Sequence, residues 1–474
     1  MLRDHFLSVI KKNFDYQCTG SQEVLLDKLS GFVTNGNDRT LFLMRGYAGT
    51  GKTTVISSLV RALSHFGMKS VLLAPTGRAA KVLSSYSGKQ AFTIHKKIYR
   101  QKSSKDGFGE FALDRNLHRD TIFIVDEASM ISNHSREMVL FGSGRLLDDL
   151  ISYVYNDLNC RLILVGDSAQ LPPVGIDISP ALDNEAIKGY GLEISEANLT
   201  DVIRQAEGSG ILCNATSIRD IIRVKGTVTG IPEFNLNGFD DIIRLDGRYL
   251  VEEITGAYDN CGMGDTLVVT RSNKQANKYN QGIRNQILWR EEMLTPGDYM
   301  MVVRNNYYWL DESDDISFIA NGDIIEILRI HRYEERYGYR FADVTLRFTD
   351  YGDLEAEAKI MIDTINLETA SLSGEDNKAF FYAVLEDYAD EKSKKKRYDK
   401  VRKDPFFNAL QVKFAYAVTC HKAQGGQWHT VFVDQGYVDK NNITIEYLRW
   451  LYTAFTRATD KLYLVNFKDE YFKD

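Results

Sequence analysis

The sequence lacks the cysteine pairs and the long apolar stretches that mark several protein classes. Its five cysteines are odd in number, far apart and never in a Cys-x-x-Cys pair. This argues against a disulfide framework or a zinc module and predicts a reducing compartment, the cytoplasm. No apolar run approaches the ~20 residues that span a bilayer, and the N-terminus lacks a secretory-signal pattern, so we expect no membrane association. Seven prolines and 35 glycines exclude a collagen-like or low-complexity chain.

An excess of positive charge is also missing. The 58 lysines and arginines are outnumbered by 65 aspartates and glutamates, which gives a formal charge of −7. Proteins that coat nucleic acid by bulk charge are usually basic, so the composition argues against a histone-like binder. A local basic groove remains compatible with this charge, because only residues within about a Debye length of the phosphates contribute.

The 474 residues do contain two series of short buried strands separated by helical stretches. At roughly 100–200 residues per domain, this length corresponds to about three domains. Strands that alternate with helices predict the α/β class, with parallel sheets covered on both faces. The expected strands are 41–45, 70–74, 121–125 and 161–165 in the first series, and 266–270, 412–418, 430–433 and 461–465 in the second.

Within the second series the periodicity changes. Residues 344–348 and 358–362 alternate between apolar and polar side chains. A period of two predicts small antiparallel strands, so we expect 295–405 to be a β-rich insertion in the second α/β unit. The end of this insertion is expected to be helical and carries a basic run at 392–403. Such a run is usually one solvated helix face, and the alternative is a contact with a single DNA strand.

Residues 46–53 (Gly-Tyr-Ala-Gly-Thr-Gly-Lys-Thr) fit the phosphate-binding loop pattern, after a strand and before a helix. Glycines let backbone N–H groups curl around phosphates, and the helix N-terminus adds partial positive charge. Lys52 of this pattern contacts the β- and γ-phosphates, and the Thr53 hydroxyl binds Mg²⁺. A glycine-rich turn without a ligand is the alternative, but the complete pattern favours an ATP site. The expected nucleotide-binding residues of the loop are Gly46, Ala48, Gly49, Thr50, Gly51, Lys52, Thr53 and Thr54.

A second part of the site is expected where the buried run 122–125 ends in Asp126 and Glu127. Ligands of open α/β sheets bind at the carboxyl ends of the strands. We expect Asp126 to hold Mg²⁺ and Glu127 to activate the attacking water. An apolar strand followed by two acids is often only a solvated strand end, but the phosphate loop upstream favours the functional interpretation.

Further motifs resemble those of superfamily 1 DNA helicases, in particular the RecD and Dda-like group that moves 5′-to-3′. The resemblance covers almost the whole chain except the insertion, and its motifs stand in the family's order. The residues that carry it are 19–22, 74–80, 93–95, 126–129, 165–174, 204–205, 416–425 and 452–458. The resemblance implies two RecA-like lobes with ATP in the cleft between them. It places one lobe at 1–195, the other at 196–294 with 406–474, and an SH3-like barrel within 295–405.

The resemblance also suggests roles for single residues. Gln22 would bind the adenine edge, although a helix-start glutamine in a solvated loop is the alternative. Gln170 follows the strand expected beside Asp126 and could sense the γ-phosphate. A departing γ-phosphate develops charge that needs cations opposite Lys52. Arg204 and Arg457 are the candidates for these arginine fingers, supplied by the second lobe of the same chain.

A motor that moves along DNA must bind the strand without reading its sequence, through phosphate contacts and base stacking. Phe92 and Trp428 are candidates for stacking, with a core role as the alternative. Phe108 lies in an Asp-Gly loop within 99–118, where the family often has a strand-separating pin; a surface loop is the alternative. The other candidate contacts are Thr76, Arg78, Thr93 and His95 in the first lobe and Thr419, His421, Lys422 and Gln424 in the second.

The sequence therefore predicts a monomeric, ATP- and Mg²⁺-dependent DNA helicase that acts on single-stranded and forked DNA. A subunit that works only inside a recombination complex is one alternative; the absence of a long N-terminal docking domain argues against it. A non-motor P-loop enzyme is another, but it would leave 416–425 and 452–458 without a function. A scaffold with an inactive nucleotide site is the third, but the expected catalytic residues are all present.

Overall fold

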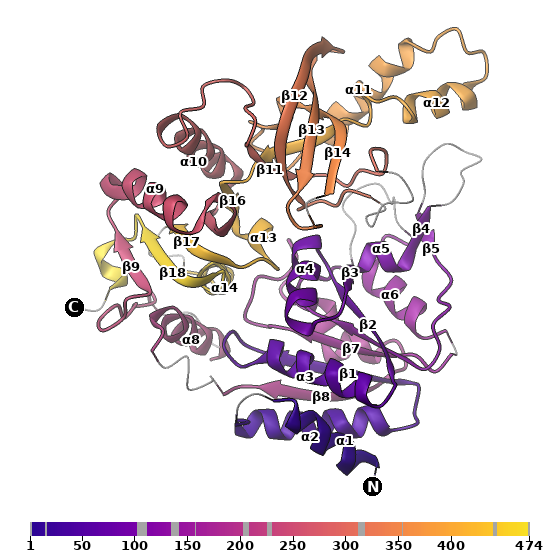
Figure 1. Cartoon of the computed structure of the whole chain (residues 1–474), viewed down its shortest axis with the longest axis vertical. Helices are drawn as coiled ribbons and strands as arrows, with labels where there is room; N and C mark the ends of the chain where they lie inside the picture. Colours follow the sequence, from indigo (N-terminus) through magenta and orange to yellow (C-terminus); the bar gives the residue numbers. More distant parts are fainter. Residues whose placement is uncertain are drawn as a thin grey trace.

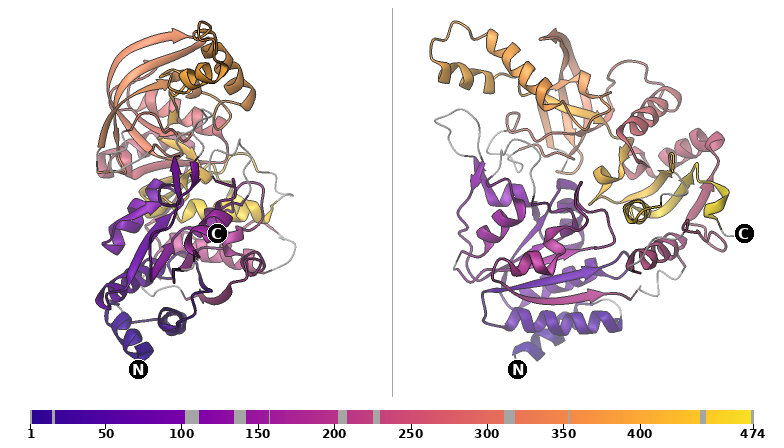
Figure 2. Two further views of the ribbon diagram at one scale, coloured as in Figure 1. Left: turned by 90° about the vertical axis from the view of Figure 1, so that its right-hand side faces the viewer. Right: turned by 180° about the vertical axis from the view of Figure 1, so that it is seen from behind.

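The computed structural model describes residues 2–14, 17–101, 111–133, 142–156, 158–201, 208–224, 230–310, 318–352, 354–438 and 443–472. The chain forms two lobes side by side, with a barrel above both of them (Figure 1). In both views of Figure 2 the barrel lies at the opposite end of the molecule from the N-terminal helices.

The first lobe is a six-stranded sheet in the order β3-β2-β6-β7-β1-β8, in which every pair of neighbours is parallel. Its strands are β1 (Thr40–Gly46), β2 (Lys69–Ala74), β3 (Ala91–Thr93), β6 (Thr121–Val125), β7 (Arg161–Gly166) and β8 (Glu193–Leu199). Its helices are α1 (Leu2–Lys12), α2 (Gly20–Thr34), α3 (Lys52–His65), α4 (Gly77–Ser87), α5 (Ile94–Ile98), α6 (Leu146–Val154) and α7 (Asn184–Lys188).

Both faces of this sheet are buried, which explains the unbroken apolar strands. Along β1, Phe42 and Met44 pack into a core with α1, α2 and α3, whereas Leu41 and Leu43 pack into a second core with α5 and α6. Because successive side chains of a strand point to opposite faces, a strand covered on both sides must be apolar throughout. Alternation is therefore absent here, as the sequence predicted.

The second lobe is a five-stranded parallel sheet in the order β16-β10-β17-β18-β9. Its strands are β9 (Ile242–Leu245), β10 (Thr266–Thr270), β16 (Ala417–Thr419), β17 (Trp428–Asp434) and β18 (Ala458–Val465). Its helices are α8 (Gly210–Arg223), α9 (Leu250–Cys261), α10 (Asn273–Gln286), α13 (Cys420–Ala423) and α14 (Ile445–Phe455).

The insertion is a closed five-stranded barrel with a helical extension that stands out from it (Figure 1). Its strands are β11 (Tyr299–Val302), β12 (Ile324–Arg336), β13 (Tyr339–Phe348), β14 (Leu354–Met361) and β15 (Leu410–Phe414), and its helices are α11 (Gly374–Glu386) and α12 (Lys394–Arg402). The expected class, two RecA-like lobes with a small inserted β-barrel, is therefore confirmed.

Two strands cross the expected domain limits. β8 continues in the first sheet to Leu199, beyond residue 195. β15 closes the barrel after residue 405. The interpretation of 412–418 as one strand of the second sheet was wrong: β15 ends at Phe414, and only β16 joins that sheet. Apolar periodicity identifies a buried strand but does not say with which sheet it pairs.

The barrel joins the second lobe through neighbouring residues. The Ala415 amide donates to the Tyr299 carbonyl at 2.9 Å, where the chain leaves and enters the barrel. Beside this point the carboxylate of Asp298 is fully buried, and it accepts hydrogen bonds from Arg284, Arg290 and the Tyr416 hydroxyl. Charged hydrogen bonds from three directions fix the base of the barrel on the lobe.

The barrel also touches the first lobe at the start of α4. A Cβ atom on Gly77 would lie 1.9 Å from the Tyr351 hydroxyl and 2.6 Å from Asp323 Oδ1. Lys81 Nζ lies 3.7 Å from Asp350 Oδ1. Only glycine at residue 77 allows this close approach.

A small antiparallel hairpin, β4 (Tyr99–Gln101) with β5 (Phe111–Leu113), projects from the first lobe. The ring of Phe111 packs on Tyr307 of the insertion, 4.1 Å between centroids. The hairpin that the sequence predicted is therefore present at its base. Its tip, with Phe108, lies outside the described residues.

Candidate functional site in the cleft between the lobes

The loop at 46–53 joins β1 to α3, with Gly49 (φ 72°) and Gly51 (φ 85°) in the left-handed region that favours glycine. The Lys52 ammonium lies within the loop and donates to the carbonyls of Gly46 and Tyr47 at 2.7 and 2.9 Å. Thr53 is exposed at the first turn of α3. This is the geometry of a phosphate cradle, with its lysine bonded to the loop itself.

Gln22 is placed against this loop by the start of α2. Its side-chain oxygen accepts from the Thr19 amide in a capping box, and its Nε2 donates to the Thr50 carbonyl, both at 3.0 Å. The residue is buried. Gln22 was expected to bind the adenine edge, and that contact stays a prediction. In the structure its amide joins the phosphate loop to α2.

The two expected carboxylates lie at the end of β6. Asp126 accepts hydrogen bonds from the Tyr86 hydroxyl at 2.5 Å and from the Glu127 amide at 2.8 Å. Glu127 has a φ of 53°, a conformation that a non-glycine residue rarely adopts and that is commoner at functional sites. Burial and the charge of Asp126 raise the pKa of the Glu127 carboxyl, against the opposing effects of Arg457 and Lys52. A carboxyl with a raised pKa is suited to accept a proton.

Arg457 reaches this site from the second lobe. It is buried at the end of α14, and its guanidinium donates to the carbonyls of Thr453 and Gly426 at 3.0 and 3.1 Å. Its charge acts on Glu127 across the cleft. The hydrogen bonds of its guanidinium lie within the second lobe, and its effect on Glu127 is electrostatic. Arg204 lies outside the described residues.

Gln170 lies just beyond β7, which pairs directly with β6, as the sequence predicted. The side chain is buried, and its Oε1 accepts no hydrogen bond from the part of the chain that the structure describes. A buried amide oxygen without a partner is costly unless a ligand or water supplies the donor. This fits a residue that faces a bound phosphate and its waters.

Several hydrogen bonds cross the cleft beside the phosphate loop. The Tyr452 hydroxyl of α14 accepts from the Ala48 amide and donates to Asp167 Oδ2, both at 2.7 Å. The Leu171 amide donates to the Thr453 hydroxyl at 2.8 Å, and Gln424 Nε2 donates to the Leu171 carbonyl at 2.6 Å. Gln424 was expected to contact DNA, and its amide instead bonds to the other lobe in this structure.

Tyr452 and Asp167 lie within the motif segments 452–458 and 165–174, but no role for them was predicted from the sequence. No role was predicted either for Arg219 of α8, whose guanidinium lies 4.8 Å from the ring of Tyr47 in the phosphate loop. In the sequence, Tyr452 and Asp167 were marked only by lying in motif segments, and Arg219 only by lying in an amphipathic helix. A contact between two lobes leaves no periodic pattern in a sequence.

The strand-contact candidates of the first lobe lie at helix starts that face the barrel (Figure 1). The hydroxyls of Thr76 and Thr93 cap α4 and α5, accepting from the amides of Ala79 and Lys96. Burial lowers the pKa of His95 to about 4, so this ring is neutral at neutral pH. His95 can therefore offer DNA a hydrogen bond but not a charge.

The candidates of the second lobe follow β16. Thr419 precedes α13, and Lys422 donates to Asn321 at the edge of the barrel. Burial lowers the pKa of His421, so this histidine is also predominantly neutral. Trp428 is buried in the core of the lobe, which favours the core interpretation over base stacking. Phe92 is half-buried with Lys96 and Lys97 near its ring.

The donors at the loop fit Mg²⁺. This ion usually takes one or two carboxylates together with substrate phosphates and waters, at octahedral geometry. Thr53 at the start of α3 and Asp126 at the end of β6 offer a hydroxyl and a carboxylate of this kind. Thr53 lies where the phosphate-loop pattern requires a hydroxyl, and Asp126 lies where the acidic residue of a P-loop ATPase is expected.

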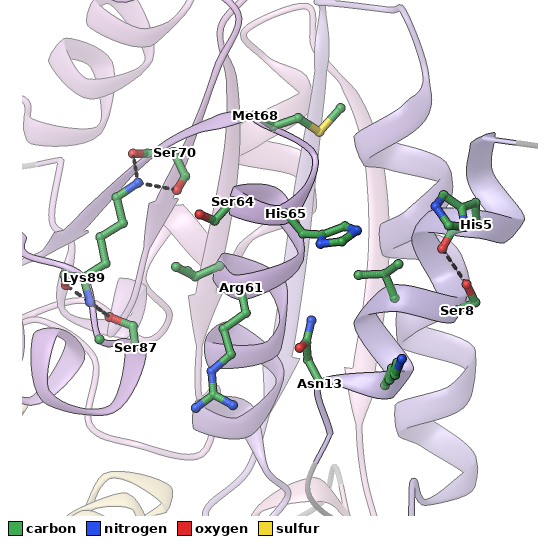
Figure 3. A pocket seen from close by; sticks show the side chains of 14 residues that line it. His5, Ser8, Asn13, Arg61, Ser64, His65, Met68, Ser70, Ser87 and Lys89 are labelled. Carbon is green, nitrogen blue, oxygen red and sulfur yellow. Dashed lines mark hydrogen bonds between the residues drawn. The ribbon is translucent and has the colours of Figure 1, made fainter.

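A large hollow of the first lobe lies away from this site (Figure 3). It has a volume of about 1060 Å³ and lies between α1, α3 and the end of α4, with His5, Lys12, Arg61, His65 and Lys89 among its side chains. None of the motif residues lines it. Chemistry, and not volume, therefore identifies the cleft as the functional site.

Comparisons with known proteins agree with this site. Residues 32–220 match the family described as "AAA domain", and residues 414–465 match the "UvrD-like helicase C-terminal domain". The chain is 25% identical to the ATP-dependent DNA helicase dda of Enterobacteria phage T4, over 89% of this chain and 93% of that protein. It is 24% identical to the ATP-dependent RecD2 DNA helicase of Deinococcus radiodurans over 93% of this chain, but it spans only 48% of that protein.

Two other matches carry less information. An uncharacterized protein, R530, of Acanthamoeba polyphaga mimivirus is 24% identical over 93% of this chain and 98% of its own length. A structure of two coordinating Pif1 helicases aligns with 96% of this chain and 94% of that one, at 13% identity and a TM-score of 0.48.

Two RecA-like lobes, with a phosphate loop on one and Arg457 on the other, are the architecture of a P-loop ATPase whose site is shared between lobes. Within that class, the chain is similar to superfamily 1 helicases of the RecD and Dda-like group.

Proposed function

We propose that this chain is an ATP-driven DNA helicase that moves 5′-to-3′ along single-stranded DNA and unwinds duplex at a fork. One observation carries most weight: α14 of the second lobe meets the phosphate loop of the first, where the Ala48 amide donates to the Tyr452 hydroxyl at 2.7 Å. An ATP site assembled from two lobes can couple hydrolysis to their relative movement. The helicase relatives RecD2 and Dda support the same function.

In this proposal each residue has a distinct task. The loop amides and Lys52 bind the phosphates, and Gln22 supports the loop and lies next to the base. Glu127 takes the proton of the attacking water. Arg457, with Arg204, stabilises the charge that develops on the γ-phosphate, and Gln170 detects that phosphate. Mg²⁺, when bound between Thr53 and Asp126, would neutralise phosphate charge.

The strand would cross both lobes beneath the barrel, against the helix starts described above. Arg78 donates to the Gln427 carbonyl of the second lobe at 3.1 Å, and Gln424 bonds to Leu171 of the first. Their contacts with DNA therefore depend on how far the lobes are closed. Phe108 is proposed to separate the strands at the fork. The basic run of α12 is a further candidate contact with DNA, since most of its lysines are exposed.

We further propose that the chain acts as a monomer in the cytoplasm. Both halves of the ATP site come from one chain, so no second copy is needed to complete it. Among the described residues no helix has the length and apolarity to cross a bilayer. The alternative is a subunit that is active only within a recombination complex, and the experiment below distinguishes it from an autonomous helicase.

The test uses purified chain with Mg-ATP and duplexes that carry either a 5′ or a 3′ single-stranded tail. We expect unwinding of the 5′-tailed duplex only, and ATP hydrolysis stimulated by single-stranded DNA. Unwinding from the 3′ tail would overturn the polarity. DNA-stimulated hydrolysis without unwinding of either substrate would favour the subunit alternative.

A further inference from the structure

One side chain, Tyr452, is anchored in the second lobe and reaches into the first. Its ring belongs to the buried core of the second lobe, and the residue is 1% exposed. Its hydroxyl lies between two groups of the first lobe, the Ala48 amide and Asp167 Oδ2, at 2.7 Å from each. These two bonds exist only when the lobes are together.

The partner carboxylate connects this hydroxyl to the phosphate loop. Asp167 is 1% exposed, and its other oxygen accepts from the Ala169 amide at 2.9 Å. Its Oδ2 also lies 3.9 Å from the ammonium of Lys52. Ala48 stands four residues before Lys52 in the same loop. The hydroxyl therefore touches the loop directly at its amide and indirectly at its lysine.

Thr453, the residue after Tyr452, also bonds to the first lobe through its hydroxyl. The Thr453 hydroxyl accepts from the Leu171 amide at 2.8 Å, next to Gln170. Two consecutive residues of α14 thus satisfy buried groups of the first lobe, one at the phosphate loop and one at the expected γ-phosphate sensor. Separation of the lobes would leave these groups to water, and a buried polar group without a partner is costly.

We propose that Tyr452 is a positioning residue that transmits closure of the cleft to the phosphate loop, through its hydroxyl bonds to Ala48 and Asp167. The inference rests on the proposed function and adds a means of regulation to that site. With the lobes closed, the hydroxyl holds the loop and Lys52 in the geometry for hydrolysis. With the lobes apart, the loop still binds nucleotide but lacks this support.

This role predicts a specific kinetic signature. Because the bonds form on closure, their loss should lower kcat and leave the affinity for ATP nearly unchanged. Loss of an interaction that is equally strong before and during hydrolysis would instead weaken ATP binding and leave kcat unchanged. Loss of one hydrogen bond that leaves buried groups unsatisfied corresponds to a decrease of about 5- to 150-fold in rate.

The test compares Tyr452→Phe with Tyr447→Phe. Both tyrosines are buried in α14, and both changes remove only a hydroxyl. The Tyr447 hydroxyl bonds within the second lobe, to Gln435 and Tyr471 at 3.3 Å. It is therefore a matched control. The measurements are ATPase kcat and KM with and without single-stranded DNA, affinity for a non-hydrolysable ATP analogue, and the melting temperature.

We expect Tyr452→Phe to lower kcat at least 5-fold, with analogue affinity within about 3-fold of wild type, while Tyr447→Phe keeps kcat. Equal kcat in the two variants would overturn the inference, as would a loss of analogue affinity equal to the loss of kcat. If Tyr452→Phe does not fold, Thr453→Val tests the neighbouring bond by the same criteria. Wild-type ATPase without DNA stimulation would contradict the helicase function, and the comparison of basal kcat would still decide the role of Tyr452.

Discussion

The guanidinium of Arg78 lies over the indole ring of Trp428, 4.1 Å from its centroid, and so joins the two lobes. It also donates to the Gln427 carbonyl at 3.1 Å. Burial lowers the pKa of Arg78, although an arginine remains charged at any working pH. A residue that the sequence assigned to DNA binding thus also connects the lobes.

Arg78→Lys separates these two roles. Lysine keeps the charge but loses the planar stacking on Trp428, whereas Arg78→Ala loses both. We expect both variants to bind single-stranded DNA more weakly than the wild-type protein, by roughly 10-fold or more, when the affinity is measured with an ATP analogue bound. Recovery by lysine, with the wild-type salt dependence, would mean that Arg78 acts only as a charge on phosphate.

Glu127→Gln should retain ATP binding and lose hydrolysis by ~10²–10⁴-fold, because an amide cannot accept the proton. The wild-type rate should also fall at acid pH, since the base must be ionised. The raised pKa of Glu127 moves that decline above the pH at which an ordinary glutamate titrates. Steady-state ATPase from pH 5 to 8 measures both effects, and normal turnover of Glu127→Gln would exclude it as the base.

Arg457→Ala should keep DNA binding nearly intact and reduce turnover by on the order of 10³-fold. Arg457→Lys should recover little, because a point charge does not reproduce the planar guanidinium. ATPase and DNA affinity should be measured on one preparation, with a melting curve as control because Arg457 also bonds to Gly426. A lysine variant with wild-type turnover would show that net charge suffices.

The carboxyl of Asp323 predicts a pH-dependent stability. It is buried where the barrel meets α4, accepts from Tyr351 at 2.9 Å, and burial raises its pKa to about 7. Between its ordinary value and about 7 the folded state binds a proton that the unfolded state releases. Its contribution to stability is therefore present at low pH and lost as pH rises through 7.

Asp323→Asn should remove this dependence, on the order of 3 kcal/mol between pH 5 and pH 8. Urea unfolding at the two pH values measures it in variant and wild type. Parallel changes in the two proteins would assign the pH dependence to other groups.

Phe108→Ala should slow duplex unwinding while DNA-stimulated ATPase and movement on single strands continue. Opening one base-pair step costs about 1.4 kcal/mol, and stacking of an aromatic ring on a base is worth ~1–3 kcal/mol. Both activities should be measured on one preparation. Equal loss of both would assign Phe108 to the fold or to strand binding.

The parts predicted from sequence are those that local patterns encode. The loop at 46–53 and the β6 end with Asp126 and Glu127 depend on short spacing and on a buried strand, and both lie where expected. The contacts between lobes were not predictable in this way. Ala48 and Tyr452 are 404 residues apart. Only the folded structure shows that the Tyr452 hydroxyl bonds to the phosphate loop of the opposite lobe. The bond of Gln22 to Thr50 likewise could be seen only in the structure.

The base of the barrel has a consequence for how such a chain can change by insertion and deletion. Entry and exit meet at the hydrogen bond between Tyr299 and Ala415, so the loop that would remain after removal of the barrel is short. Closing a short loop costs little conformational entropy. The barrel thus occupies one connection of the sheet that carries β10 and β16. It also shares an apolar core with that lobe, so a turn in its place would expose lobe residues such as Val268 and Phe432.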